Sequence, residues 1–347
     1  MSSDTIGASV REAVPSPVPD RRTARVVMGL GAANLALILL SVTLGEYSVT
    51  LADAGRVLVG ASPEDSSTAF IVRGIRLPRV AAALLVGCAL GVAGTILQGL
   101  TRNVLAAPSV LGITQTASLF AVGAIVLLPT FSEATVSLFA FAGAAAAAVV
   151  IYAFGWREGL ASSRIVLIGI GVTATSTALV TFLLTFGEIH RIERALVWMI
   201  GSVYGRGWMD LIWLVPWLLV ALPTAMWGVR VLDALALGDD VATSLGSRVL
   251  AGRAGLLLVA VGLVGSAVAT AGALTFVGLM APHAARRMVG PRHGRVIPVS
   301  ALIGAGIVAA ADLAARRVFA PVELPCGVVT AVLGAPFFVY LLIRRRS

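Results

Sequence analysis

Long apolar runs, separated by short polar segments, follow one another along almost the whole chain. Each run is about 20 residues long, which is the length that a helix needs to cross the hydrocarbon core of a membrane. The pattern therefore predicts an all-α polytopic membrane protein with about ten transmembrane helices. The predicted spans are residues 26–45, 77–100, 109–129, 134–155, 164–187, 208–230, 250–271, 273–289, 296–317 and 326–343.

Composition supports this class and leaves little room for a soluble domain. Hydrophobic residues make up 58% of the chain, charged residues make up 12%, and the mean hydropathy is +0.97. An ordinary soluble domain carries about 25% charged residues. We therefore expect a single transmembrane domain over residues 25–347, preceded by a polar, disordered cytoplasmic leader over residues 1–24.

The leader ends in arginines that stand directly before the first apolar run, namely Arg21, Arg22 and Arg25. A twin-arginine signal peptide has the same general layout. The run that follows is long enough to span the membrane, however, and no A-x-A cleavage site comes after it. An uncleaved first transmembrane helix is therefore the favoured interpretation.

Every one of the 26 basic side chains is an arginine, and the chain has no lysine. A Walker A loop needs a lysine on the phosphates, and Schiff-base chemistry needs a lysine amine, so both are excluded. The net charge of +9 comes from arginines scattered among the loops between spans. This distribution favours anchoring at a membrane surface over nucleic-acid binding. The chain is therefore not expected to hydrolyse ATP by the P-loop route.

The arginines also predict the orientation of the chain. Most of them fall in alternate inter-span loops, and short cytoplasmic loops are the ones enriched in arginine. Both termini are therefore expected inside. The arginines that agree are Arg157, Arg164, Arg230, Arg248, Arg253, Arg286, Arg287, Arg292, Arg295, Arg344, Arg345 and Arg346.

Other arginines lie on the outside in this topology, in the 188–206 loop and at Arg73, Arg76, Arg79, Arg316 and Arg317. The positive-inside tendency gives no reason to keep them there. An acidic partner outside the membrane is one explanation. Snorkelling of the side chains to lipid headgroups is the other.

The predicted spans contain almost no charge. Ion-coupled transporters usually carry ionisable residues at bilayer depth, and here only Asp312 qualifies, four residues before Arg316, with which it can form an i,i+4 pair. Gln98 and Gln115 can serve either as helix–helix hydrogen bonds or as ligand contacts. The driving force for any transport must therefore come from elsewhere.

Glycine supplies the packing between spans. Gly87 and Gly91 form a G-x-x-x-G pair in the second span, where small residues allow close helix approach. Gly201 and Gly205 have the same spacing in the outer loop. The spacing of Gly87, Gly94 and Gly99 is echoed at Gly265, Gly272 and Gly278, which suggests two repeats of opposite orientation.

The segment 231–253 between the sixth and seventh spans contains a short amphipathic stretch, residues 237–245. Asp239 and Asp240 stand early in it, where a helix dipole favours negative charge, and Gly246 is a plausible C-terminal stop. One interpretation is an ordinary capped interfacial helix. The other is a coupling helix that fits a groove on a cytoplasmic motor.

Five blocks of sequence resemble one family. They are RLPR at 76–79, LQGLTRNVLAAPSVLG at 97–112, LALGDDVATSLG at 235–246, TFVGLMAPHAARRMVGPRHGR at 275–295 and ADLAARRVFAPVELPCGVVTAVLGAPFFVYLL at 311–342. The chain resembles the FecCD family, the permease subunits of iron–siderophore, haem and cobalamin ABC importers. It departs from the family at Val104, where proline is usual.

The resemblance implies a type II importer permease that pairs with a second copy or a close homologue, with the pathway between the two. It implies that the chain is a transport subunit rather than an enzyme, and that two cytoplasmic ATPase subunits bind and hydrolyse the ATP. Their coupling residues would be Leu237, Gly238, Asp239, Asp240, Ala242, Leu245 and Gly246. An extracytoplasmic binding protein would dock on Arg76, Arg79 and Arg316. Pathway or packing residues would be Gly87, Gly91, Gly94, Gln98, Asn103, Pro108, Gly278, Pro282 and His283.

No cofactor or metal is expected on this chain. His283 is a lone histidine, and metal sites need several convergent ligands, so a structural role is favoured. The predicted function is import of ferric siderophore complexes through a bacterial plasma membrane. The alternatives are a haem or cobalamin importer permease and, from another class, a self-sufficient secondary transporter.

Overall fold

The computed structural model describes residues 21–45, 47–61, 67–155, 162–244, 249–318 and 322–344, and helices account for nearly all of them. No strand occurs in these ranges. The long helices are α2 (Arg21–Thr43), α5 (Leu77–Thr101), α6 (Ile113–Leu127), α7 (Glu133–Gly155), α8 (Ser162–Phe186), α10 (Val215–Trp227), α13 (Val249–Ala271), α14 (Val277–Val289), α15 (His293–Arg317) and α16 (Cys326–Arg344). The shorter elements are α3 (Leu51–Leu58), α4 (Ser67–Ala69), η1 (Phe70–Arg76), α9 (Ile189–Ile200), η3 (Trp208–Trp213), α11 (Val229–Ala236) and α12 (Asp239–Ser244).

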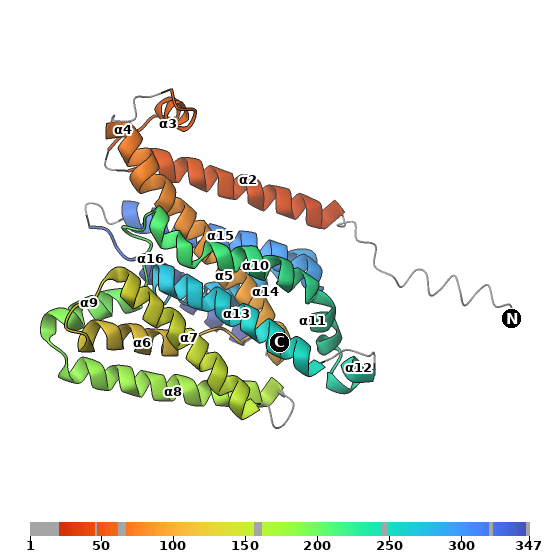
Figure 1. Ribbon diagram of the computed structural model, residues 1–347. Helices are drawn as coiled ribbons and strands as arrows, with labels where there is room; N and C mark the ends of the chain where they lie inside the picture. The colour runs from red at the N-terminus through yellow and green to blue at the C-terminus, as the bar shows by residue number, and fades with distance from the viewer. Residues whose placement is uncertain are drawn as a thin grey trace.

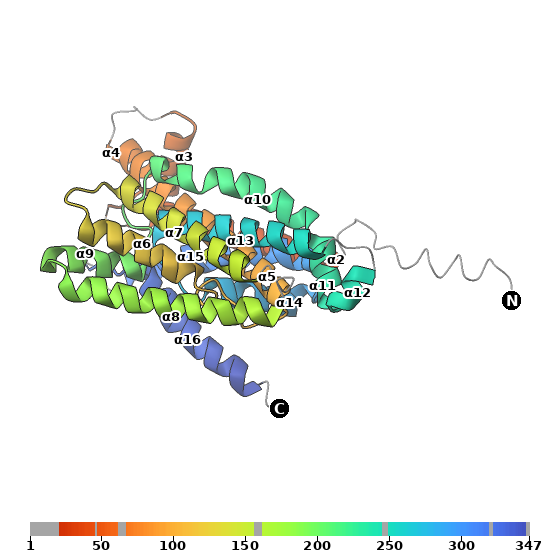
Figure 2. The ribbon, with the colours of Figure 1, turned by 60° about the horizontal axis from the view of Figure 1, so that its bottom comes forward.

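The long helices run side by side in one bundle (Figure 1). At one end, here called the α9 end, lie α3, α4 and α9; at the other, the α12 end, lie α11 and α12. Figure 2 shows the same two ends, with the C-terminal part of α16 leaning away from the bundle. Helices α5 and α13 form the centre, and most of their side chains are buried, whereas α2 and α8 lie at the periphery and are mostly exposed.

Each predicted span corresponds to a helix, so the predicted fold class is confirmed. Seven helices of the described part are long and apolar enough to cross a membrane. The spans predicted at 109–129 and 326–343 are the shorter apolar helices Ile113–Leu127 and Cys326–Tyr340. The span predicted at 273–289 shortens to α14, with 13 residues. Non-helical backbone beside such short helices is tolerated at membrane depth only where protein surrounds it.

Two local predictions need correction. The outer loop predicted at 188–206 contains a helix, α9, whose charged residues had obscured its amphipathic period. Of the amphipathic stretch predicted at 237–245, the described residues form a helix over Asp239–Ser244 and not at Leu237 and Gly238. Gly238 has a φ of +106°, which ends α11 and turns the chain, so that both aspartates begin the next helix. Leu245 and Gly246 lie outside the described residues.

The centre of the bundle depends on glycines of α5. A Cβ added at Gly87 would collide with the backbone of Gly304, and one added at Gly91 would collide with Ser300, both on α15. A Cβ at Gly94 would collide with the backbone of Gly278 on α14. These three glycines therefore set how closely α5 approaches two neighbouring helices.

We expect Gly87→Ala to destabilise the protein, because the new methyl group must displace the α15 backbone. Overpacking of this kind costs about 1–3 kcal/mol, measurable as a lower unfolding temperature in detergent. The matched control is Gly29→Ala on α2, where a Cβ meets nothing within 4 Å. Equal stability of the two variants would contradict the assigned α5–α15 contact.

Candidate functional site: the two ends of the bundle

A buried arginine–carboxylate cluster occupies the α9 end. Arg79, in the first turn of α5, donates from Nε to Asp312 Oδ1 at 3.0 Å and from Nη2 to the same oxygen at 2.9 Å. Its Nη1 donates to Glu323 Oε2 at 2.9 Å. The Arg79 guanidinium also lies 5.3 Å from the centre of the Tyr204 ring. One side chain thus joins α5, α15, the segment before α16 and the loop after α9.

The two other arginines of the predicted docking set also have partners within the chain. Arg316 Nε lies 3.4 Å from Asp312 Oδ2, as the i,i+4 spacing predicted. Arg76 Nη1 donates to the carbonyls of Val42 at 2.6 Å and Thr43 at 3.2 Å. Arg76 therefore holds the end of α2.

These contacts correct one step of the sequence argument. An outside partner is not needed to explain why Arg76 and Arg79 are kept, because both are buried and bonded within the protein. Docking on this surface stays a prediction.

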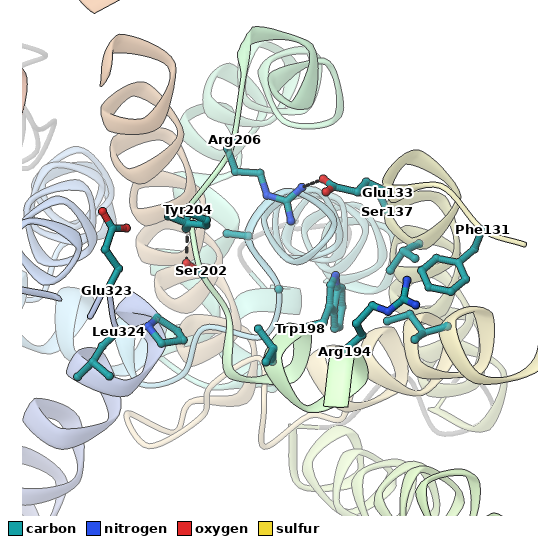
Figure 3. Close-up of a pocket in the computed structure, with 16 residues that line it drawn as sticks. Phe131, Glu133, Ser137, Arg194, Trp198, Ser202, Tyr204, Arg206, Glu323 and Leu324 are labelled. Carbon is teal, nitrogen blue, oxygen red and sulfur yellow. Dashed lines mark hydrogen bonds and ion pairs between the residues drawn. The ribbon is translucent and has the colours of Figure 1, made fainter. Parts of the chain in front are cut away.

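Beside the cluster, a cavity of about 600 Å³ opens at the α9 end. Figure 3 shows aromatic and charged side chains around it, with Trp198, Arg194 and Phe131 on one side and Tyr204 and Glu323 on the other. The Arg194 guanidinium stacks 5.4 Å from the Phe131 ring centre. This lining can contact a ligand that has both apolar and anionic parts.

At the α12 end, the two aspartates of the predicted coupling helix lie in different environments. Asp240 is exposed. Asp239 accepts two hydrogen bonds from Arg253, at 2.7 Å on Oδ1 and 3.1 Å on Oδ2. Leu237, at the end of α11, and Val241, in α12, are 64% and 43% exposed, so the α11–α12 segment presents apolar side chains outward.

A hydrogen-bonded contact between Asp233 and His293 fixes α11 at this end. Asp233 Oδ1 accepts from the backbone N–H of His293 at 3.0 Å and lies 2.7 Å from His293 Nδ1. Burial raises the pKa of Asp233, but the hydrogen bonds from His293 lower it by more, so the net pKa lies below the usual carboxyl value. The ionised Asp233 carboxylate thereby fixes the first residue of α15 to α11.

The residues predicted as pathway or packing positions make contacts inside the bundle. Gln98 on α5 accepts a hydrogen bond from Arg286 on α14. Asn103 Oδ1 accepts from the Leu105 N–H at 3.0 Å in the turn after α5. A Cβ at Gly278 would touch Pro108. His283 stands edge-on to Phe337, with ring centres 5.7 Å apart, and Pro282 lies inside α14. The cavity lining does not include these positions.

Sequence reasoning missed three partners: Glu323, Ser162 and Asp233. Glu323 lies 244 positions from Arg79, to which it is bonded, and Ser162 lies 91 positions from Arg253, whose Nη2 donates to its Oγ at 3.2 Å, so no local spacing indicates them. The contact of Asp233 with His293 crosses 60 positions. A buried arginine requires acceptors for its N–H groups. This requirement is the one general indication that such partners exist, but it does not say which residues they are.

Comparison with known proteins places these features in a family. The sequence model of the FecCD transport family matches residues 33–344. YfhA of Bacillus subtilis strain 168, assigned as a siderophore transport system permease protein, is 40% identical over 332 residues, covering 93% of this chain and 94% of YfhA. The hemin transport system permease protein HmuU of Yersinia pestis is 37% identical over 331 residues, covering 93% of both chains.

A solved structure gives the same result. The chain superposes on a metal-chelate-type ABC transporter in an inward-facing conformation with a TM-score of 0.83 and 25% sequence identity. The superposition covers 92% of this chain and 99% of the other.

We expect Arg79→Met and Asp312→Asn each to destabilise the protein strongly. Each change leaves a buried charge without its main partner, at a cost of about 3–5 kcal/mol, whereas removing both charges can be nearly neutral. The measurement is a double-mutant cycle of unfolding free energies in detergent.

Glu323→Gln is the control for this cycle. The Glu323 side chain is 33% exposed, so its loss should cost less than the loss of Asp312. Strict additivity of Arg79→Met and Asp312→Asn would show that the cluster is not a coupled unit.

Proposed function

Since this chain belongs to the FecCD transport family and is a multi-pass permease subunit of an inner-membrane ABC importer, we propose that it imports ferric siderophore complexes. The match of the family to residues 33–344 carries the proposal, and the siderophore assignment of the relative YfhA supports the substrate. A haem importer is the alternative, which the relative HmuU supports. The ATP of the transport cycle is bound by the partner ATPase.

We propose that both termini lie inside and that the ATPase docks at the α12 end. Most of the described arginines that were predicted to be cytoplasmic lie on elements that reach this end: Arg164 in the first turn of α8, Arg230 on α11, Arg253 in the second turn of α13, Arg286 and Arg287 in the last turn of α14 and Arg295 in the first turn of α15. Leu237, Asp240 and Val241 are exposed around the start of α12 and give this surface a mixed apolar and acidic character. Such a face can fit a groove on a partner, in which a few residues provide most of the binding energy.

The binding protein then docks at the α9 end, over Arg76, Arg79 and Arg316. Arg79 already has two carboxylate partners, so an acidic residue of the binding protein has to share or replace one of them. Glu323 is the more exposed of the two, which makes the Arg79–Glu323 contact the one open to exchange. The chelate delivered there would meet the cavity of Figure 3.

We propose that a second permease subunit packs against α8 and that the pathway runs between the two. Gly171, Ala174, Ala178, Thr181 and Thr185 recur three or four positions apart and are all exposed. Small and hydroxyl-bearing residues are typical of helix–helix contacts in membranes rather than of lipid-facing surfaces. The second subunit can be a copy of this chain or a close homologue.

A self-sufficient secondary transporter is the remaining alternative. Its mark would be a titratable group free to change its charge at mid-membrane. Asp312, the candidate for that role, lies near the α9 end and is held by Arg79 and Arg316. This arrangement favours a structural role for Asp312.

Transport itself is tested in proteoliposomes. We expect the chain with its cognate ATPase and binding protein to accumulate an iron-55 ferric hydroxamate when ATP is present inside. The chain alone should not hydrolyse ATP, because it lacks a phosphate-binding lysine. It should not take up the chelate in response to a proton gradient either, because Asp312 is held in ion pairs. Proton-driven uptake by the chain alone would support the secondary transporter, and uptake of hemin in place of the hydroxamate would reassign the substrate.

Docking is tested with Arg316→Gln, which removes charge without placing a carboxylate beside Asp312. If docking buries Arg316, its loss should weaken binding-protein affinity by about 2 kcal/mol or more, or roughly 30-fold. In titrations at several salt concentrations, the affinity of the Arg316→Gln variant for the binding protein should also depend less on salt than that of the unmodified chain.

The matched control for docking is Arg25→Gln, an exposed arginine on the first turns of α2 at the opposite end. The affinity of this variant for the binding protein, and the salt dependence of that affinity, should equal those of the unmodified chain. An unchanged affinity for Arg316→Gln across the salt series would leave internal pairing as the role of Arg316.

A further inference from the structure

Arg253 is among the largest side chains that are fully buried, with 1% of its surface exposed. It lies in the second turn of α13, where the sequence predicted a cytoplasmic anchoring charge. A buried guanidinium destabilises a fold unless carboxylates and hydrogen bonds compensate it. Asp239 supplies both oxygens, at 2.7 and 3.1 Å, in a two-pronged contact.

The same guanidinium continues the contact into the bundle. Arg253 Nη2 donates to Ser162 Oγ at 3.2 Å, and Ser162 Oγ donates to the carbonyl of Leu100 at 3.0 Å. Ser162 is the first residue of α8, and Leu100 lies in the last turn of α5. One carboxylate on α12 is thus connected to the α12 ends of three transmembrane helices.

Apart from a longer and more exposed contact of Asp239 with Arg102, whose Nη2 lies 3.8 Å from Asp239 Oδ1, helix α12 has little else to hold it. It has six residues, and Ala242 is its one buried side chain. Gly238, with a φ of +106°, forms the turn that separates it from α11. Apolar packing of a single alanine cannot fix the direction of a helix, so the two-pronged contact of Asp239 with Arg253 sets how α12 is oriented.

We propose that Asp239 is a positioning residue that transmits movement of α12 to α13, α8 and α5, whereas the neighbouring Asp240 faces the ATPase. Successive residues of a helix point about 100° apart, so the two acids cannot serve one surface equally. Paired ionic groups on rigid elements are a means by which coupling between distant sites is carried. This inference rests on the proposed docking of the ATPase at α12.

The inference separates two variants that differ by one position. In the complete transporter in proteoliposomes, Asp239→Asn should leave ATPase binding intact but raise the ATP hydrolysed per chelate imported. A rise of about fivefold corresponds to the lower end of coupling between protein sites. Asp240→Asn should instead weaken ATPase binding and leave that ratio unchanged in the complexes that form.

A second variant separates coupling from mere stability, because Asp239→Asn alone deprives the buried Arg253 of its Asp239 carboxylate. In Asp239→Asn with Arg253→Met, both charges are removed, so thermal stability should recover. The ratio of ATP hydrolysed to iron-55 hydroxamate imported should nevertheless stay raised, since the link is still absent. A structural role alone would restore the ratio together with the stability.

The outcomes distinguish this inference from the function on which it rests. If the unmodified chain does not bind the ATPase, the proposed docking fails. If the unmodified chain binds and transports, but both Asp239 variants keep the normal ratio at full stability, Asp239 does not position α12 and the inference is overturned.

Discussion

The close approach of helix backbones is the constraint on which the rest of this structure depends. Lipid offers helices no hydrophobic drive to associate, so they gain stability from contact between their own atoms. In α5, Gly87, Gly91 and Gly94 allow α15 and α14 to approach with backbone against backbone. Because α5 is held along its length, the positions of its two ends are also determined, and both ends carry the polar contacts of the protein.

The two ends use the same physical arrangement. At each end, a buried arginine donates hydrogen bonds to carboxylate oxygens on other elements. Arg79 donates to Asp312 and Glu323, and Arg253 donates to Asp239. A guanidinium suits this role because it is planar, keeps its charge at all physiological pH values and donates in a fixed fork. Neither end can change shape without separating opposite charges, so movement of one helix at an end has consequences for its neighbours.

The sequence predicts those features that depend on neighbours along the chain. Runs of about 20 apolar residues located the helices, and the i,i+4 spacing predicted the contact of Asp312 with Arg316. Contacts between distant segments could not be predicted in this way. Arg79 and Asp312 are 233 positions apart, and nothing near Arg79 indicates that it is buried. From its place between two apolar runs, Arg253 was predicted to be a charge at the membrane surface. The segment that forms α9 was predicted to be a loop, because charged residues interrupt its apolar positions. In each case burial decided the role, and burial is a property of the assembled bundle.

The small number of buried residues in α12 has a consequence for how the protein can evolve. Side chains that contribute nothing to the core can be replaced without a loss of folding stability, and most of those on α12 are of this kind. If the ATPase docks on this surface as proposed, partner recognition can diverge between related transporters while the bundle and its buried charges stay the same. Duplicated permeases could acquire separate motors through a few substitutions in one short helix.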